Sequence, residues 1–127
     1  MCIRDRCYKH RDKANEISKM MLIGDVKGKD IVLVDDMVDT AGTLTRAADL
    51  MMENGANSVR ACCTHAILSG GAYDRINNSQ LSELIVTDTL RKEHKSDKVK
   101  VIEIGNLFAD TLNRVYTKQS ISSNFIS

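Results

Sequence analysis

The chain has 127 residues, the size of one ordinary domain, and 43% of them are hydrophobic, which is enough to build a core. No apolar run approaches the ~20 residues that a membrane-spanning helix needs, and no apolar segment of a secretory signal is present, so we expect a cytoplasmic protein. The 18 basic residues nearly balance the 17 acidic ones, so the net charge of +1 does not favour a nucleic acid or an anionic membrane as partner.

The first part of the chain predicts a loop, a strand and a turn. Residues 7–15 are mostly polar and carry several basic groups, which is typical of an exposed loop. Residues 16–23 are apolar enough for a strand, and residues 24–30 contain two glycines. Residues 24–30 are similar to a Walker A loop, but the spacing is one residue short and Asp30 stands where a Ser or Thr must bind Mg²⁺. We therefore predict a β-turn there.

The most informative segment begins at residues 31–34, four branched apolar residues that predict a central strand buried on both faces. Asp35 and Asp36 follow where this strand should end, and residues 39–43 then lead into a helical pattern. A loop between a strand and a helix N-terminus suits an anion, because free N–H groups and the positive end of the helix dipole face the ligand. The two acids suit sugar hydroxyls or Mg²⁺. The segment predicts a site for a molecule with a phosphate at one end and a diol at the other.

Helical and strand patterns alternate along the rest of the chain. Leu44, Ala47, Ala48 and Met51 form the stripe of an amphipathic helix, and Gly55 stands where a left-handed cap is wanted. The later elements are a strand at 59–64, a break at 69–71, a short helix at 72–76, a strand at 84–87, a charged connection at 91–98, a strand at 99–104 and a helix lined by Leu107, Phe108, Leu112 and Val115. This order predicts an α/β fold, a single domain with a doubly wound, mostly parallel sheet.

Polar residues follow several of the predicted strands. Ligands of such sheets lie beyond the carboxyl ends of the strands, so residues 35–43, 64–65, 69–71 and 87–89 should meet at one edge. We expect His65 either to be a structural histidine with its hydrogen bonds made within the protein or to contact a nucleotide. Cys63 and His65 are weak candidates for a metal site because the chain has no C-x₂-C pair, and buried free thiols are the better interpretation of the cysteines.

The two acids and the following turn closely resemble the phosphoribosyl-pyrophosphate loop of the type I phosphoribosyltransferase fold. The flanking sequence resembles the C-terminal half of the ribose-phosphate pyrophosphokinases at Cys7-Tyr8-Lys9-His10-Arg11, Asn15-Glu16, residues 24–29, Cys63-Thr64-His65, Leu68-Ser69-Gly70, residues 86–89 and residues 119–123. The resemblance covers residues 7–127, and we interpret residues 1–6, which do not resemble the family, as an N-terminal scar or extension. The family has a second domain N-terminal to this one.

The resemblance implies a ribose 5-phosphate site. Asp35 and Asp36 would bind the ribose hydroxyls and the accompanying Mg²⁺. The 5-phosphate would be held by Asp39, Thr40, Ala41, Gly42 and Thr43. A carboxylate near a phosphate repels it, so Asp39 is expected to orient the loop or to meet the sugar rather than the phosphate.

The resemblance also implies catalytic and regulatory residues. Lys9 and Arg11 match the flexible catalytic loop, where cations would stabilise phosphoryl oxygens while the 1-hydroxyl of ribose 5-phosphate attacks the β-phosphorus of ATP and AMP leaves. Arg11 would also contact ribose 5-phosphate. Ser120 and Ser122 match serines of an inter-subunit site for phosphate and ADP.

The family assembles as dimers and hexamers, and much of the ATP pocket would come from the other domain and a neighbouring subunit. We therefore expect this chain alone not to turn over. Two alternatives stay open: a nucleobase phosphoribosyltransferase of the same fold, and a non-catalytic regulatory subunit that keeps the ribose-phosphate loop and assembles with an intact synthase.

Overall fold

The computed structural model describes residues 6–9, 20–90 and 95–124. Their elements, in chain order, are β1 (Arg6–Lys9), β2 (Met20–Ile23), β3 (Asp30–Val38), α1 (Gly42–Glu53), β4 (Ser58–Ala66), α2 (Ala72–Asn78), β5 (Glu83–Thr87), β6 (Val99–Ile102), α3 (Gly105–Tyr116) and a 3₁₀ turn at Ser122–Asn124. Within these ranges, each helix is too short or too polar to cross a bilayer.

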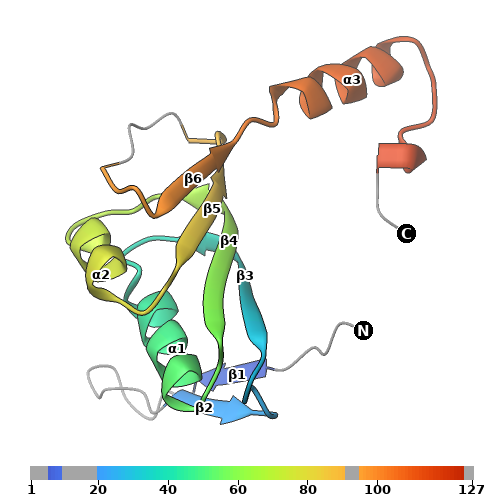
Figure 1. Ribbon diagram of the computed structural model, residues 1–127. Helices are drawn as coiled ribbons and strands as arrows, with labels where there is room; N and C mark the ends of the chain where they lie inside the picture. Colours follow the sequence, from blue (N-terminus) through green and yellow to red (C-terminus); the bar gives the residue numbers. More distant parts are fainter. Residues whose placement is uncertain (1–5, 10–19, 91–94, 125–127) are drawn as a thin grey trace.

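Four of the strands form one parallel sheet, in the order β3-β4-β5-β6. Figure 1 shows α1 and α2 together on one side of this sheet. The predicted α/β class with a mostly parallel sheet is confirmed. Each strand pairs with the next one along the chain, and the helices α1 and α2 form the first two connections.

β1 and β2 form a separate antiparallel pair, in which Arg6 lies opposite Ile23 and Lys9 opposite Met20. The prediction of an exposed loop is therefore wrong for residues 7–9, while residues 10–15 lie outside the described residues. The polar composition of these residues predicted a loop, but strand pairing is made by backbone N–H and C=O groups and does not depend on the side chains. The strand expected at 16–23 is confirmed over Met20–Ile23.

β3 is longer and less buried than its apolar run predicts. It continues beyond residue 34 to Val38, and it is an edge strand of the described sheet, so the prediction of a central strand buried on both faces is wrong. Ile31 and Leu33 are half-buried against the core, whereas Val32 and Val34 are 61% and 78% exposed. Only the face that α1 and α2 cover is buried, and successive side chains alternate between the faces.

The core lies between the sheet and helices α1 and α2. Its largest fully buried side chains are Leu68, Ile76, Leu81, Leu84, Val59 and Val86. Helix α1 buries the stripe that its sequence predicts, and Ala48 at its centre is completely inaccessible. Burial of a Leu or Val side chain stabilises the fold by about 1.5–3 kcal/mol.

A glycine cap ends α1, as the sequence predicts. Gly55 has φ +89°, its N–H donates to the carbonyl of Met52 at 3.0 Å, and the Ala56 N–H donates to the carbonyl of Met51 at 3.1 Å. These two bonds are those of a Schellman motif. The Gly55 carbonyl accepts from the Gly28 N–H at 2.8 Å, so the same residue connects the end of α1 to the turn before β3.

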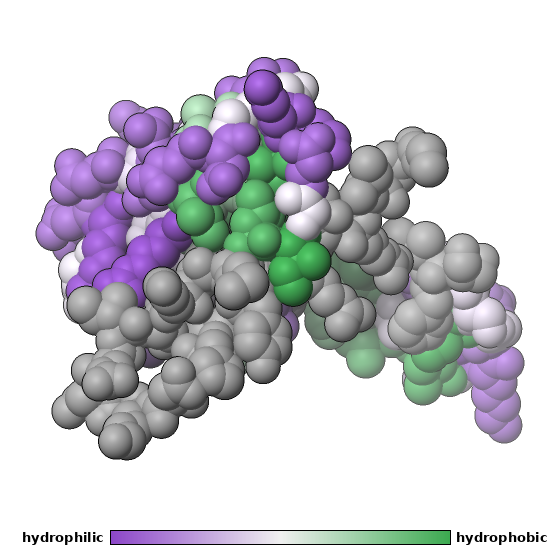
Figure 2. Space-filling model, turned by 90° about the horizontal axis from the view of Figure 1, so that it is seen from below, coloured by the Kyte–Doolittle hydropathy of each residue, from purple (hydrophilic) through white to green (hydrophobic). Residues whose placement is uncertain are grey.

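Helix α3 has the predicted position, and its apolar residues are exposed. It projects away from the sheet in Figure 1, and none of its residues is buried. Leu107, Phe108, Leu112 and Val115 are all more than half exposed. Figure 2 shows hydrophobic residues at the surface in two places, in the middle of the molecule and on the more distant part that carries α3.

Substitution of Gly55 by Ala tests the cap. A residue with a Cβ at this positive φ costs about 1–2 kcal/mol, and the added atom would lie 3.4 Å from Lys27 Cγ. We expect urea unfolding to give a free energy of unfolding lower by that amount. Gly105→Ala is the matched control, because a Cβ at the first residue of α3 meets nothing within 4 Å. Equal losses in the two variants would contradict the assignment.

Candidate functional site

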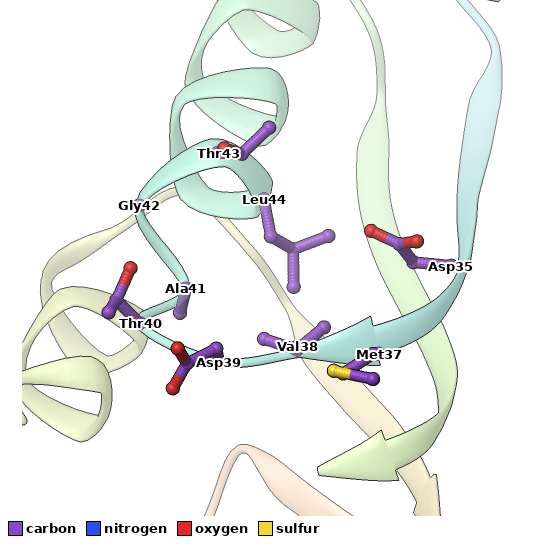
Figure 3. A pocket seen from close by; sticks show the side chains of 9 residues that line it. All are labelled: Asp35, Met37, Val38, Asp39, Thr40, Ala41, Gly42, Thr43 and Leu44. Carbon is purple, nitrogen blue, oxygen red and sulfur yellow. The ribbon is translucent and has the colours of Figure 1, made fainter. Parts of the chain in front are cut away.

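A cavity of about 200 Å³ lies where β3 ends and α1 begins (Figure 3). Its lining is Asp35, Met37, Val38, Asp39, Thr40, Ala41, Gly42, Thr43 and Leu44. We call residues 39–43 the ligand turn. Ligand pockets usually occupy about 300–1,000 Å³, so this cavity suits a small ligand or one part of a larger one.

The ligand turn presents the start of α1 without a side-chain cap. Ala41 occupies the N-cap position in a left-handed conformation, with φ +60°, and makes no side-chain hydrogen bond there. The Ala41 carbonyl accepts from both the N–H and the hydroxyl of Thr45, at 3.0 and 2.9 Å. Since the first N–H groups of a helix have no partner inside it, this end suits an anion.

A second loop, residues 67–71, runs beside the ligand turn. The Leu68 N–H donates to the Val38 carbonyl at 3.1 Å, and the Ser69 N–H donates to the Asp39 carbonyl at 3.0 Å. The Ser69 hydroxyl donates to the Asp39 carboxylate. From α2, Arg75 Nη1 donates to the Thr40 carbonyl at 2.7 Å. The loops after β3 and β4 therefore meet, as the topology predicts.

The two neighbouring acids lie within β3 rather than after its end, which corrects the sequence prediction. Strand pairing continues past them to Val38, opposite Ala66, and both acids are exposed. Asp35 lines the cavity, and Asp36 does not belong to the lining. Asp35 lies opposite Cys63 of β4. Burial of that thiol, together with the Asp35 charge, raises the pKa of Cys63 to about 11.

His65 and three threonines form a hydrogen-bonded group at the same edge. His65 Nδ1 lies 2.9 Å from the Thr89 hydroxyl. The hydroxyls of Thr87 and Thr89 both donate to the Thr64 carbonyl, at 2.7 and 3.0 Å. The predicted convergence of these segments is confirmed. The contact with Thr89 favours a structural role for His65.

Of the two sequence candidates for catalysis, Lys9 lies elsewhere. Lys9 is the last residue of β1, and Figure 1 shows β1 and β2 at the end of the sheet where β3 and β4 begin, opposite the cavity. Arg11 lies outside the described residues.

The Walker-like segment, residues 24–30, forms the predicted β-turn, which is closed by a 3.1 Å hydrogen bond from the Lys29 N–H to the Val26 carbonyl.

The C-terminal serines pack near the end of α3. The Ser120 hydroxyl donates to the Ser122 hydroxyl at 3.0 Å. Arg114 Nη1 donates to the Ser120 carbonyl at 3.3 Å and to the Ser123 hydroxyl at 3.1 Å. Arg114 and Asn124 also donate to Asp110, and these bonds lower the pKa of its carboxyl group. The structure therefore brings Ser120 and Ser122 together, far along the chain from the ligand turn.

The donor set of the cavity fits Mg²⁺ as a partial site only. Among residues 6–9, 20–90 and 95–124 there is no cluster of three acidic, histidine or cysteine side chains suited to a metal. Mg²⁺ is usually held by one or two carboxylates together with substrate phosphates. Asp35 offers such a carboxylate at the cavity, so the structure suits a magnesium ion that arrives with a phosphorylated ligand.

The family described as the phosphoribosyl synthetase-associated domain matches residues 8–126. The chain belongs to this family. The ribose-phosphate pyrophosphokinase of Campylobacter jejuni is 51% identical over 118 residues, which are 93% of this chain and 38% of that protein. That of Porphyromonas gingivalis is 52% identical over 117 residues, or 92% and 37%.

A solved structure is also similar to this member of the family. Phosphoribosylpyrophosphate synthetase from Mycobacterium smegmatis superposes with a TM-score of 0.77 at 34% identity, over 88% of this chain and 37% of that one. The resemblance to ribose-phosphate pyrophosphokinases is thus confirmed. The chain spans less than two fifths of the length of these relatives.

Sequence reasoning missed three contributors to the site. The sequence predicts Leu44 only as part of the helix stripe, although it also lines the cavity. Thr45 is the one buried polar residue of the described core. Its position four residues after Ala41 is a sequence signal for the bond from its hydroxyl to the Ala41 carbonyl. Arg75 donates a hydrogen bond to the Thr40 carbonyl, 35 residues away in the sequence, and no local sequence pattern predicts that contact.

The raised pKa of Cys63 gives a test of where Asp35 lies. A lower pKa means more thiolate at a given pH, so removing the Asp35 charge in Asp35→Asn should speed alkylation of Cys63 by iodoacetamide at pH 9 several-fold. Tandem mass spectrometry distinguishes Cys63 from the adjacent Cys62. Asp36→Asn is the matched control, and we expect it to leave the rate unchanged. A rate that rises equally in both variants would contradict the placement of Asp35.

Proposed function

We propose that this chain supplies the ribose 5-phosphate half of a ribose-phosphate pyrophosphokinase. The complete enzyme would transfer the pyrophosphoryl group of ATP to the 1-hydroxyl of ribose 5-phosphate, giving phosphoribosyl pyrophosphate and AMP for nucleotide biosynthesis. The observation that carries the proposal is the cavity in which Asp35 and the ligand turn surround an uncapped helix start. Family membership supports the same reaction.

The ligand turn would hold the 5-phosphate. The start of α1 has no side-chain cap, and the N–H groups of a first helical turn and the positive end of the helix dipole favour an anion there. Thr40 and Thr43 line the same cavity with hydroxyl groups. Gly42 adds no side chain, so the backbone can approach the phosphate closely. These groups bind and orient the substrate without taking part in bond formation.

Asp35 and Asp36 would bind the other end of the substrate. Carboxylates accept hydrogen bonds from a vicinal diol, and Asp35, which lines the cavity, would accept them from the ribose. Mg²⁺, held by Asp35 and the substrate, would neutralise charge on the phosphoryl oxygens. Asp36 is the next residue of β3, and its side chain belongs to the opposite face of the sheet because successive side chains alternate. Its proposed contact therefore requires a ligand that reaches round the β3 edge of the sheet.

Lys9 and Arg11 would act as cationic groups on the transferring phosphoryl. Positive charge placed where negative charge builds up lowers the barrier to phosphoryl transfer. Lys9 lies at the end of β1. Its distance along the molecule from the cavity means that this role requires either loop closure or a site on a neighbouring subunit.

The ATP site and the assembly would involve protein beyond this chain. We propose that adenine is bound mainly by the part of the relatives that this chain does not span, and that the full protein forms dimers or hexamers in the cytoplasm. Exposed apolar residues such as Val34 on the sheet and Leu112 on α3 support such association. Ser120 and Ser122 would belong to an inter-subunit site for phosphate and ADP.

Titration calorimetry with ribose 5-phosphate and Mg²⁺ tests the proposal. We expect the 127-residue chain to bind one ligand, and Asp35→Asn to weaken binding about tenfold or more, because a hydrogen bond to a charged group contributes about 1.5–3 kcal/mol. Asp25→Asn makes the same charge change in the turn before β3 and should bind normally. No binding by the unsubstituted chain would refute the proposed site.

An activity assay distinguishes the functions. We expect the chain alone to release no AMP from ATP, ribose 5-phosphate and Mg²⁺, because it spans only part of its relatives. AMP release that depends on ribose 5-phosphate would contradict that expectation. Consumption of phosphoribosyl pyrophosphate with a free base would instead indicate a phosphoribosyltransferase, and co-purification with an intact synthase would indicate a regulatory subunit.

A further inference from the structure

We propose that Ser69 and Arg75 are positioning residues that hold the ligand turn in its anion-binding conformation. We call these two residues the clamp. They come from the loop after β4 and from α2, and each makes a side-chain hydrogen bond to the ligand turn. The inference rests on the proposed function, since it explains how the ribose 5-phosphate site is built.

Arg75 controls the direction of a peptide group. Its guanidinium donates to the Thr40 carbonyl at 2.7 Å. In a trans peptide the carbonyl and the following N–H point in opposite directions. Holding the Thr40 carbonyl toward α2 therefore aims the Ala41 N–H away from α2. The lining of the cavity includes both residues, so this peptide is part of the cavity wall.

Ser69 controls the direction of a charge. Its hydroxyl donates to the Asp39 carboxylate, and its N–H donates to the Asp39 carbonyl at 3.0 Å. In Figure 3 the Asp39 carboxylate lies on the opposite side of Ala41 from Gly42 and Thr43. A carboxylate close to a bound phosphate would repel it, because both groups are negatively charged. Ser69 thus keeps the negative charge of Asp39 off the phosphate position.

The conformation of the ligand turn needs such support. Ala41 has φ +60°, a region in which a residue with a Cβ is strained and persists only when its surroundings fix it. The loop that carries Ser69 is anchored in the core, because Leu68 before it and Ala72 after it are only 2% and 0% exposed. Leu68 is also held at a positive φ of 47°. Each of the two facing loops therefore contains a residue in a strained backbone conformation.

Two variants and two controls test the clamp. Ser69→Ala and Arg75→Met each remove one hydrogen bond to the ligand turn. Ser79→Ala removes a hydroxyl that donates to the Ile76 carbonyl at the far end of α2. Arg60→Met removes an exposed cation at the opposite end of β4. Urea unfolding identifies any variant whose fold is impaired, and Ser69→Thr restores the hydroxyl.

The first readout needs no ligand. NMR relaxation gives backbone order parameters for residues 39–43 and, for comparison, for the middle of α1. We expect them to fall in the ligand turn of Ser69→Ala and Arg75→Met, to be restored in Ser69→Thr, and to stay unchanged in both controls. Unchanged order parameters of the ligand turn in both clamp variants would overturn the proposal.

The second readout is binding of ribose 5-phosphate by calorimetry. We expect the dissociation constant to rise about tenfold in each clamp variant, to return to within about threefold of the unsubstituted value in Ser69→Thr, and to stay there in both controls. Unweakened binding by both clamp variants would also overturn the proposal. If the unsubstituted chain binds no ribose 5-phosphate, the proposed function fails, and the order parameters still decide whether the clamp positions the ligand turn.

Discussion

The parallel pairing of β3 with β4 is the constraint on which the site depends. Asp35 lies opposite Cys63, Met37 opposite His65 and Val38 opposite Ala66. Because the pairing reaches Val38, the chain segments that follow both strands leave the sheet side by side and continue to bond each other. A shift of one residue would turn every β3 side chain to the other face, which would take Asp35 from the cavity.

Helices α1 and α2 cover one face of the sheet and leave the other face exposed. Leu84 and Val86 are buried beneath the helices, while Val32 and Val34 on the other face are open. On that open face Arg60 pairs with Glu83 across β4 and β5 at 3.1 Å, and both side chains keep substantial exposure. An exposed ion pair contributes about 0–1 kcal/mol, so this face adds little to the stability of the isolated chain. Contacts with other protein would therefore decide how stable that face is.

Much of the fold could be predicted because its signals are local. The stripe of α1, its end at Gly55 and the β-turn before β3 each depend on residues within one or two turns of chain. The cavity could be located in advance for a related reason, since parallel strands bring their carboxyl ends to one edge. The roles of Lys9, Arg11, Ser120 and Ser122 remain predictions.

The failures have a different physical origin. Asp35 and Asp36 suggested a strand end, but an exposed edge strand tolerates carboxylates because water still solvates them. Burial of residues 31–34 depends on what covers the second face, and the sequence of the strand does not contain that information. The contacts of Arg75 and Ser69 join segments about 30 residues apart, so their partners become visible only once the sheet is assembled.

The neighbouring-strand order has a consequence for how the chain folds. Asp30 pairs with Ser58, Arg60 with Glu83 and Leu84 with Val99, so the loop that each pairing closes becomes shorter toward the C-terminus. Halving a loop lowers its closure entropy cost by about 0.6 kcal/mol. The β5–β6 pairing therefore has the lowest closure entropy cost and β3–β4 the highest, so the ligand turn follows the strand pairing with the largest entropic cost in the sheet. Its geometry is completed only when the longest loop has closed.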